Sequence, residues 1–137
     1  MPTLLLPDIE QAVIAHLAAD TDIQAITDTV RADILGPYPM LRAMRTGGTP
    51  ERRLDHALLF IDAYGDVPSA RPAGERGVLN LLARTAVRVL VDLEGQSVGD
   101  CDVSAVIPVV VMQWLPDPLT DQGRYHNVVA IHARTRK

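Results

Sequence analysis

Histidines are the side chains in this sequence most able to do acid–base or metal chemistry, and there are four: His16, His56, His126 and His132. His126 and His132 stand six residues apart on an expected strand, so they share a face but lie about 20 Å apart. His56 follows Asp55, but neighbours on a strand point to opposite faces, so this carboxylate does not orient the imidazole as a base. The histidines therefore predict neither a metal site nor a catalytic base.

The single cysteine, Cys101, is flanked by Asp100 and Asp102. Acidic neighbours disfavour the thiolate, so we expect a structural thiol rather than a nucleophile. One cysteine forms no intramolecular disulfide and holds no metal by itself, which suits a reducing compartment. The acidic segment from Asp92 to Asp102 lacks the alternating carboxylates and closing glutamate of a calcium-binding EF-hand loop. We therefore expect no enzyme activity, no metal and no cofactor.

Arginines gather in one segment together with acidic residues; its charged members are Arg42, Arg45, Glu51, Arg52, Arg53 and Asp55. Arginine forms bidentate pairs with carboxylates and is enriched at protein interfaces. The intervening run Gly47-Gly48-Thr49-Pro50 predicts a loop, and no helix start follows it, so it is no phosphate-binding glycine loop. Two interpretations stay open: a solvated loop, or a loop that docks onto a neighbouring subunit.

Charge is unevenly distributed along the chain, although the net charge is only −4. Residues 1–40 carry six acids and one base, and residues 92–121 carry six acids and no base. Such segregation suits complementary faces on two copies of one chain, with Asp100 and Asp102 as candidate partners for the arginines. Chance clustering on a solvated surface is the alternative. The acidic balance disfavours general nucleic-acid binding.

Length and composition fit one globular domain over residues 1–137, with an apolar fraction of 47%. No apolar run approaches the roughly 20 residues of a membrane-spanning helix, and Met1–Leu6 lacks the basic region of a secretory signal. We therefore expect no membrane partner.

Periodicity predicts seven elements. Asp8 caps a helix over 8–19, and the apolar spacing from Val78 to Leu90 predicts a second helix over 72–92. In the strand over 102–113, alternate residues from Val103 to Val111 are expected to face one way, and Pro108 marks an edge position or a bulge. The expected strands are 30–35, 40–46, 54–64, 102–113 and 125–134. The order α-β-β-β-α-β-β predicts an α/β (α+β) domain, with one twisted, mostly antiparallel sheet of four or five strands and two helices packed on one face.

The segment from Arg45 to Gly65 resembles the central block of the tail terminator proteins of long-tailed (siphovirus-type) bacteriophages, especially those infecting actinobacteria. The start Pro7-Asp8-Ile9-Glu10 and the later motifs Trp114-Leu115-Pro116-Asp117-Pro118 and Gly123-Arg124-Tyr125 fit the same family, so the resemblance covers most of the chain as an order of elements. Leu58 and Phe60 depart from it, because the family leads us to expect more polar residues on that strand face.

The resemblance implies a structural virion protein that assembles in the host cytoplasm and takes its place in the tail or neck. It implies a homohexameric ring that caps the head-proximal end of the tail tube, stops tube polymerisation and offers a surface for head–tail joining. The implied partners are other copies of the chain, the tail-tube protein and a head-completion or connector protein. Genomic DNA would pass through the ring without specific binding.

Other functions stay open. A head-completion protein or a tail-tube subunit would share the ring, but a tube subunit polymerises into long cylinders. A small enzyme or ligand-binding α/β domain needs a pocket with converging polar groups, and the sequence offers no such group. A DNA-binding regulator is disfavoured by the acidic balance and by the mostly apolar helix over 72–92.

Overall fold

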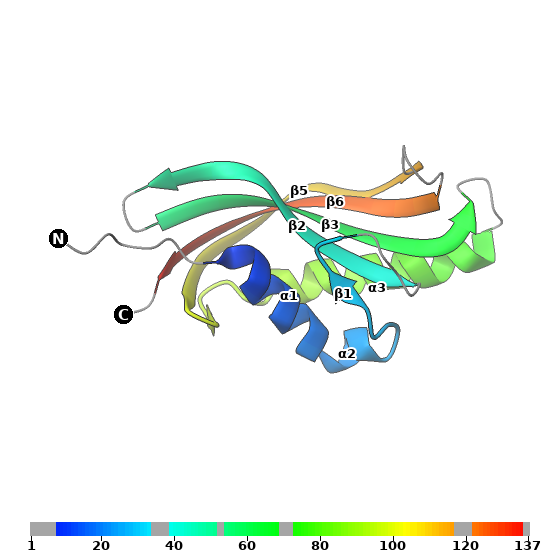
Figure 1. Ribbon diagram of the computed structural model, residues 1–137, viewed down its shortest axis with the longest axis horizontal. Coiled ribbons are helices and arrows are strands. Elements are labelled where there is room, and N and C mark those ends of the chain that lie inside the picture. Colours follow the sequence, from blue (N-terminus) through cyan, green and yellow to red (C-terminus); the bar gives the residue numbers. More distant parts are fainter. Residues whose placement is uncertain (1–7, 34–38, 52–53, 69–72, 117–121, 136–137) are drawn as a thin grey trace.

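The computed structural model describes residues 8–33, 39–51, 54–68, 73–116 and 122–135. In this part of the chain a curled sheet carries all the helices on one of its faces (Figure 1). The elements are α1 (Ile9–Ala19), α2 (Thr21–Gln24), β1 (Val30–Arg31), β2 (Met40–Glu51), β3 (Leu54–Pro68), α3 (Ala73–Val91), β4 (Ser97–Val98), β5 (Cys101–Pro116) and β6 (Gln122–Thr135).

The strand order is β1-β2-β3-β6-β5-β4. The long strands β2, β3, β6 and β5 pair with one another in antiparallel orientation, whereas the short β1 is parallel to β2. The predicted mixed class and the mostly antiparallel sheet are confirmed. The strand expected over 30–35 is present as β1, although it spans only Val30–Arg31. The sheet has six strands rather than the expected four or five, because the two-residue strand β4 is too short to leave a periodic pattern.

The beginning of α1 was predictable because its cap is local. Asp8 accepts a hydrogen bond from the backbone amide of Gln11, at 3.0 Å, and thereby pairs one of the otherwise free amides of the first turn. Asp20 does the same for α2, accepting from the amides of Asp22 and Ile23. With this four-residue helix the described residues form three helices, whereas the sequence predicts only two.

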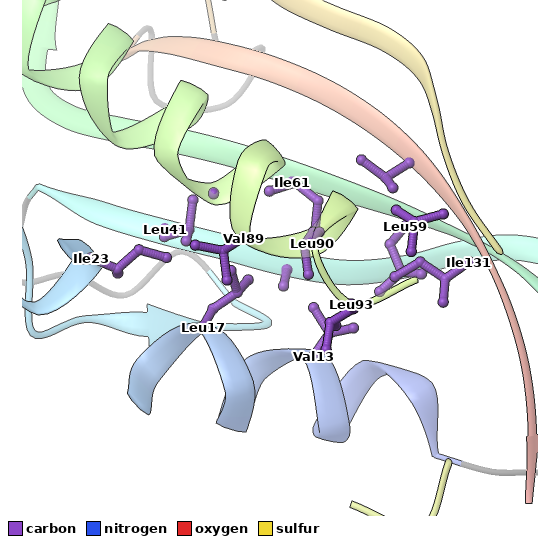
Figure 2. Packing of buried hydrophobic residues seen from close by; sticks show 14 of the residues in the cluster. Val13, Leu17, Ile23, Leu41, Leu59, Ile61, Val89, Leu90, Leu93 and Ile131 are labelled. Atoms are coloured by element: carbon purple, nitrogen blue, oxygen red, sulfur yellow. The ribbon is translucent and has the colours of Figure 1, made fainter. Parts of the chain in front are cut away.

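The core lies between the helices and the sheet (Figure 2). Val13 and Leu17 of α1 face the apolar stripe of α3 beneath the inner side of the sheet. The stripe predicted for α3 is confirmed, because five of its members are buried: Leu79, Leu82, Ala86, Val89 and Leu90. This packing fixes which sheet face is covered and which is left open.

The predicted loop at Gly47–Pro50 is wrong, because β2 continues to Glu51 and pairs with β3 throughout. The pairing shifts register between Arg45 and Gly47, and Gly48 adopts a φ of 117°. A Cβ at Gly48 would overlap the carbonyl oxygen of His56 on β3, so this glycine serves a close backbone approach rather than a turn.

Strand β5 contains the expected irregularity at its proline. The register with β6 shifts between Pro108 and Val110, which confirms the predicted bulge. Further shifts follow Val103 and Val110, so the expected single face for alternate residues 103–111 is wrong. Val103 is buried among the helices, whereas Val109 is exposed.

Candidate functional site

Polar side chains from three strands meet on the sheet face opposite the helices. Arg42 of β2 stands opposite Asp62 of β3, and Asp62 stands opposite His126 of β6. Two register positions further along, Tyr64 stands opposite Arg124. We call these five residues the Asp62 cluster. They alternate with the core residues of the same strands, so they project away from α1 and α3.

Asp62 is the centre of this cluster and has no exposed surface. Arg42 Nη2 donates to Asp62 Oδ2 at 3.0 Å, and Arg124 Nη1 lies 3.3 Å from the same oxygen. His126 Nδ1 lies 2.7 Å from Asp62 Oδ1, on the other side of the carboxylate. Arg124 Nη1 also donates to the Tyr64 hydroxyl at 3.0 Å. Two guanidinium groups and an imidazole therefore converge on one carboxylate.

The charges of the cluster do not balance. Arg42 and Arg124 carry two positive charges, and Asp62 is the one carboxylate that contacts them among the described residues. The Nε atoms of both arginines are buried and have no hydrogen-bond partner there. Burial raises the pKa of Tyr64, and the positive charge of Arg42 partly opposes that rise. The cluster thus holds a neutral phenol and excess positive charge.

Two of the predicted interaction residues, Arg45 and Asp55, pair with each other on the helix-covered side of the sheet. Arg45 Nη2 donates to Asp55 Oδ1 at 2.7 Å, and Nη1 donates to Oδ2. Asp55 is fully buried, and it raises the pKa of Arg45 through these hydrogen bonds. The Arg45 amide also donates to Glu10 Oε2 at 2.8 Å, which ties β2 to α1.

The remaining predicted residues are spread across the sheet. Arg42 belongs to the Asp62 cluster, and Arg52 and Arg53 lie outside the described residues. Asp100 is exposed in the turn between β4 and β5, and Asp102 accepts a hydrogen bond from Ser97 at 2.6 Å. The acidic turn lies toward the opposite edge of the sheet from Arg42 and Arg45, so it does not meet these two arginines within one chain. Their contact with another subunit stays a prediction.

Both edges of the sheet are largely open among the described residues. Strand β1 pairs only with Leu41 and Arg42 of β2, which leaves residues 43–51 paired on one side (Figure 1). On the other edge, β4 pairs with Cys101 and Asp102, and the backbone of Gly95 and Gln96 bonds Val103. The Val106 amide donates to Glu94, and residues 107–116 of β5 pair only with β6. The apolar side chains Ile107, Val109 and Val111 are exposed along this second edge.

Sequence reasoning missed Asp62, Tyr64, Arg124 and His126 as members of one site. The alternation of residues 54–64 does place Asp62 and Tyr64 on one strand face. A carboxylate among apolar strand residues signals a buried ion pair. Identifying the partners required the strand register, which the sequence does not state.

Within the described ranges no three His, Cys, Asp or Glu side chains are grouped as metal ligands require. Cys101 is buried. None of the described helices combines the length and apolar character needed to cross a membrane.

Comparison with known proteins gives a likeness of fold. No protein-family model matches the chain, and no curated protein is similar in sequence. Among solved structures, a chain described as "Virion of native gene transfer agent (GTA) particle" is similar over 92% of this chain and 94% of its own length. The TM-score is 0.60 and the sequence identity is 13%. At that identity the likeness establishes a shared fold.

Proposed function

We propose that this protein is a structural component of a phage-like virion and acts as a tail terminator. It forms a homohexameric ring at the head-proximal end of the tail tube, stops tube growth and receives the head-completion protein. The fold shared with a chain of a gene transfer agent virion, over nearly the whole length of both chains, supports a virion role. The resemblance of the segment from Arg45 to Gly65 to tail terminators supports the particular place in the virion.

The two open sheet edges are the observation that carries the ring. Strand β2 is antiparallel to β3, β3 to β6 and β6 to β5, so β2 and β5 run in opposite directions. Rotation about an axis along the strands preserves strand direction. The β5 edge of one copy therefore meets the β2 edge of the next in antiparallel orientation, as neighbouring strands do within the chain. This interface is heterologous, and such an interface closes into a ring when its rotation closes.

Burial of the β5 edge supplies the driving force for that contact. Ile107, Val109 and Val111 are each about half exposed. Covering the remaining surface of one such side chain contributes on the order of 1 kcal/mol, and new backbone hydrogen bonds satisfy the free edge. One edge contact is therefore weak, because association entropy opposes it. When the ring closes, or when a tube end holds several copies together, the contacts act jointly and are sufficient for stable association.

A structural role also fits the chemistry of the chain. The carboxylate at the centre of the Asp62 cluster is held by three partners and is fully buried. We propose that the protein is not an enzyme, needs no cofactor and belongs to the tail or neck of the virion. Its partners are other copies of itself, the tail-tube protein and the head-completion protein, and genomic DNA passes through the ring.

The edge contact is tested by the variant Val109→Lys. This valine is 57% exposed, so the lysine is accommodated in the free chain but places an unpaired charge in the β5–β2 contact. The matched control is Val78→Lys on α3, where the valine is 49% exposed. We expect wild type and Val78→Lys to cap purified tail tubes as single rings in negative-stain images, and Val109→Lys to leave the tubes uncapped. Equal capping by Val109→Lys would refute the proposed interface.

A further inference from the structure

The Asp62 cluster carries more positive charge than its described neighbours offset. The Arg42 side chain is 11% exposed and the Arg124 side chain 14%, and the two share the single carboxylate of Asp62. Burying a charge is costly unless it is paired and hydrogen-bonded. Both Nε atoms are also buried without a hydrogen-bond partner. A group that only stabilised the monomer would be better served by one arginine than by two.

The donors of the cluster point toward a common place. Arg42 and Arg124 both contact Asp62 Oδ2, so the two guanidinium groups lie next to each other around one oxygen. The Tyr64 hydroxyl is held by Arg124, which fixes the position of that guanidinium. Guanidinium groups present forks of N–H donors that match the oxygens of phosphate, and such charge-assisted bonds are the strong ones.

The face that carries the cluster decides which oxyanion reaches it. The described helices lie on the other face of the sheet, so the Asp62 cluster lies on the face without helices (Figure 1). The parts of Arg42 and Arg124 that stay exposed, 11% and 14% of the side chains, belong to this face. In a ring whose strands run along the axis with the helices outward, this face lines the channel. The DNA that passes through such a channel presents its phosphates to the wall.

We propose that the Asp62 cluster binds a phosphate group of the DNA that passes through the ring. This inference rests on the proposed function, because the ring brings DNA to this face. Phosphate fits better than a carboxylate, because it offers more oxygens to two guanidinium groups that already hold the Asp62 carboxylate. The contact reads no base, so it holds DNA independently of sequence. It also reconciles a phosphate contact with a chain of net charge −4, because the positive charge is local.

The experiment measures binding of inorganic phosphate to the purified chain by titration calorimetry, at an ionic strength held constant with sodium chloride. Arg124→Gln removes one guanidinium and should weaken phosphate binding about tenfold or more. Arg84→Gln is the matched control, because Arg84 is exposed on α3 and bonds only Asn80 at 2.7 Å among the described residues. It should bind phosphate as wild type does.

A second variant protects the test against a simple loss of folding. Asp62→Asn removes the negative charge and keeps the shape of the side chain. It should bind phosphate more tightly than wild type, because both arginines then lack their counter-charge. A purely structural cluster would lose stability in this variant without any gain in affinity. A short DNA duplex should compete with phosphate in wild type, and it should compete more weakly in Arg124→Gln.

Each outcome decides the proposal. Phosphate binding that Arg124→Gln weakens, Asp62→Asn strengthens and duplex DNA competes away supports it. No phosphate binding, an equal loss in Arg84→Gln, or a preference for acetate over phosphate overturns it, and the preference for acetate would indicate an acidic protein partner. Phosphate binding without competition by duplex DNA overturns the assignment to DNA. Ring formation is measured separately by imaging, so a chain that forms rings without binding phosphate refutes only this inference.

Discussion

Replacing Leu82 by alanine tests whether α3 is held to the sheet by the core described above. Leu82 has no exposed surface and belongs to the cluster between the helices and the sheet. Its neighbour Leu81 is 47% exposed on the same helix. Leu82→Ala removes buried apolar groups and leaves a cavity, which costs about 2–5 kcal/mol of unfolding free energy. Leu81→Ala makes the same chemical change with no cavity and should cost under about 1 kcal/mol.

The assay is equilibrium unfolding in urea, followed by far-ultraviolet circular dichroism for wild type and both variants. The two variants change helix propensity equally, since both replace leucine by alanine in mid-helix. The difference between their unfolding free energies therefore isolates the buried contact. We expect a difference of roughly 2 kcal/mol or more. Equal stability of the two variants would show that α3 does not pack on the sheet through this stripe.

Three further predictions concern the sheet. Gly48→Ala should destabilise the chain by at least about 1 kcal/mol in urea unfolding, because its φ is 117°, whereas Gly47→Ala meets nothing within 4 Å and should be tolerated. Arg45→Gln should cost about 2–3 kcal/mol, because a fully buried carboxylate loses its partner. Arg88→Gln should change the melting temperature little, because the Arg88 side chain is 57% exposed. Burial raises the pKa of Tyr64, so the folded chain loses stability as the pH rises above about 10, and Tyr64→Phe should lessen that loss in alkaline unfolding.

The helices and long strands could be predicted because their signals are local. Asp8 caps the first turn of α1 through its own neighbouring residue, and the apolar spacing of α3 repeats over several turns. Both signals act within a few residues and survive without any knowledge of the tertiary structure.

The sequence predictions were wrong where the pairing of strands, rather than the local amino-acid composition, decides the structure. Gly47 to Pro50 has the composition of a turn, but an open edge tolerates a proline, and a bulge requires a glycine where two backbones meet closely. The prediction that alternate residues of β5 share one face was wrong because of its bulges, since each bulge shifts the alternation by a residue. A strand of two residues, such as β4, leaves no pattern to detect.

The candidate site was likewise predictable only in part. The sequence identifies Arg42 and Arg45 as charged residues in an interacting segment, but it does not tell which carboxylate each one contacts. The strand register assigns Asp62 to Arg42. The contact of Arg45 with Asp55 lies beside the bulge that follows Arg45 on β2, where the strand pairing is distorted. The convergence of Arg124 on Asp62 joins residues that are 62 positions apart, which no local pattern contains.

The length of tails made in the absence of this chain tests the proposed function most directly. Particles assembled with and without the chain, in cells that supply every other virion component, are compared by electron microscopy. With the chain, tails should have one uniform length, end in a single ring and join heads. Without it, tubes of unregulated length that carry no heads should accumulate, and resupplying the chain should restore normal tails. Tails of normal length without the chain would contradict a terminator, and the absence of any tube would indicate a tube subunit instead.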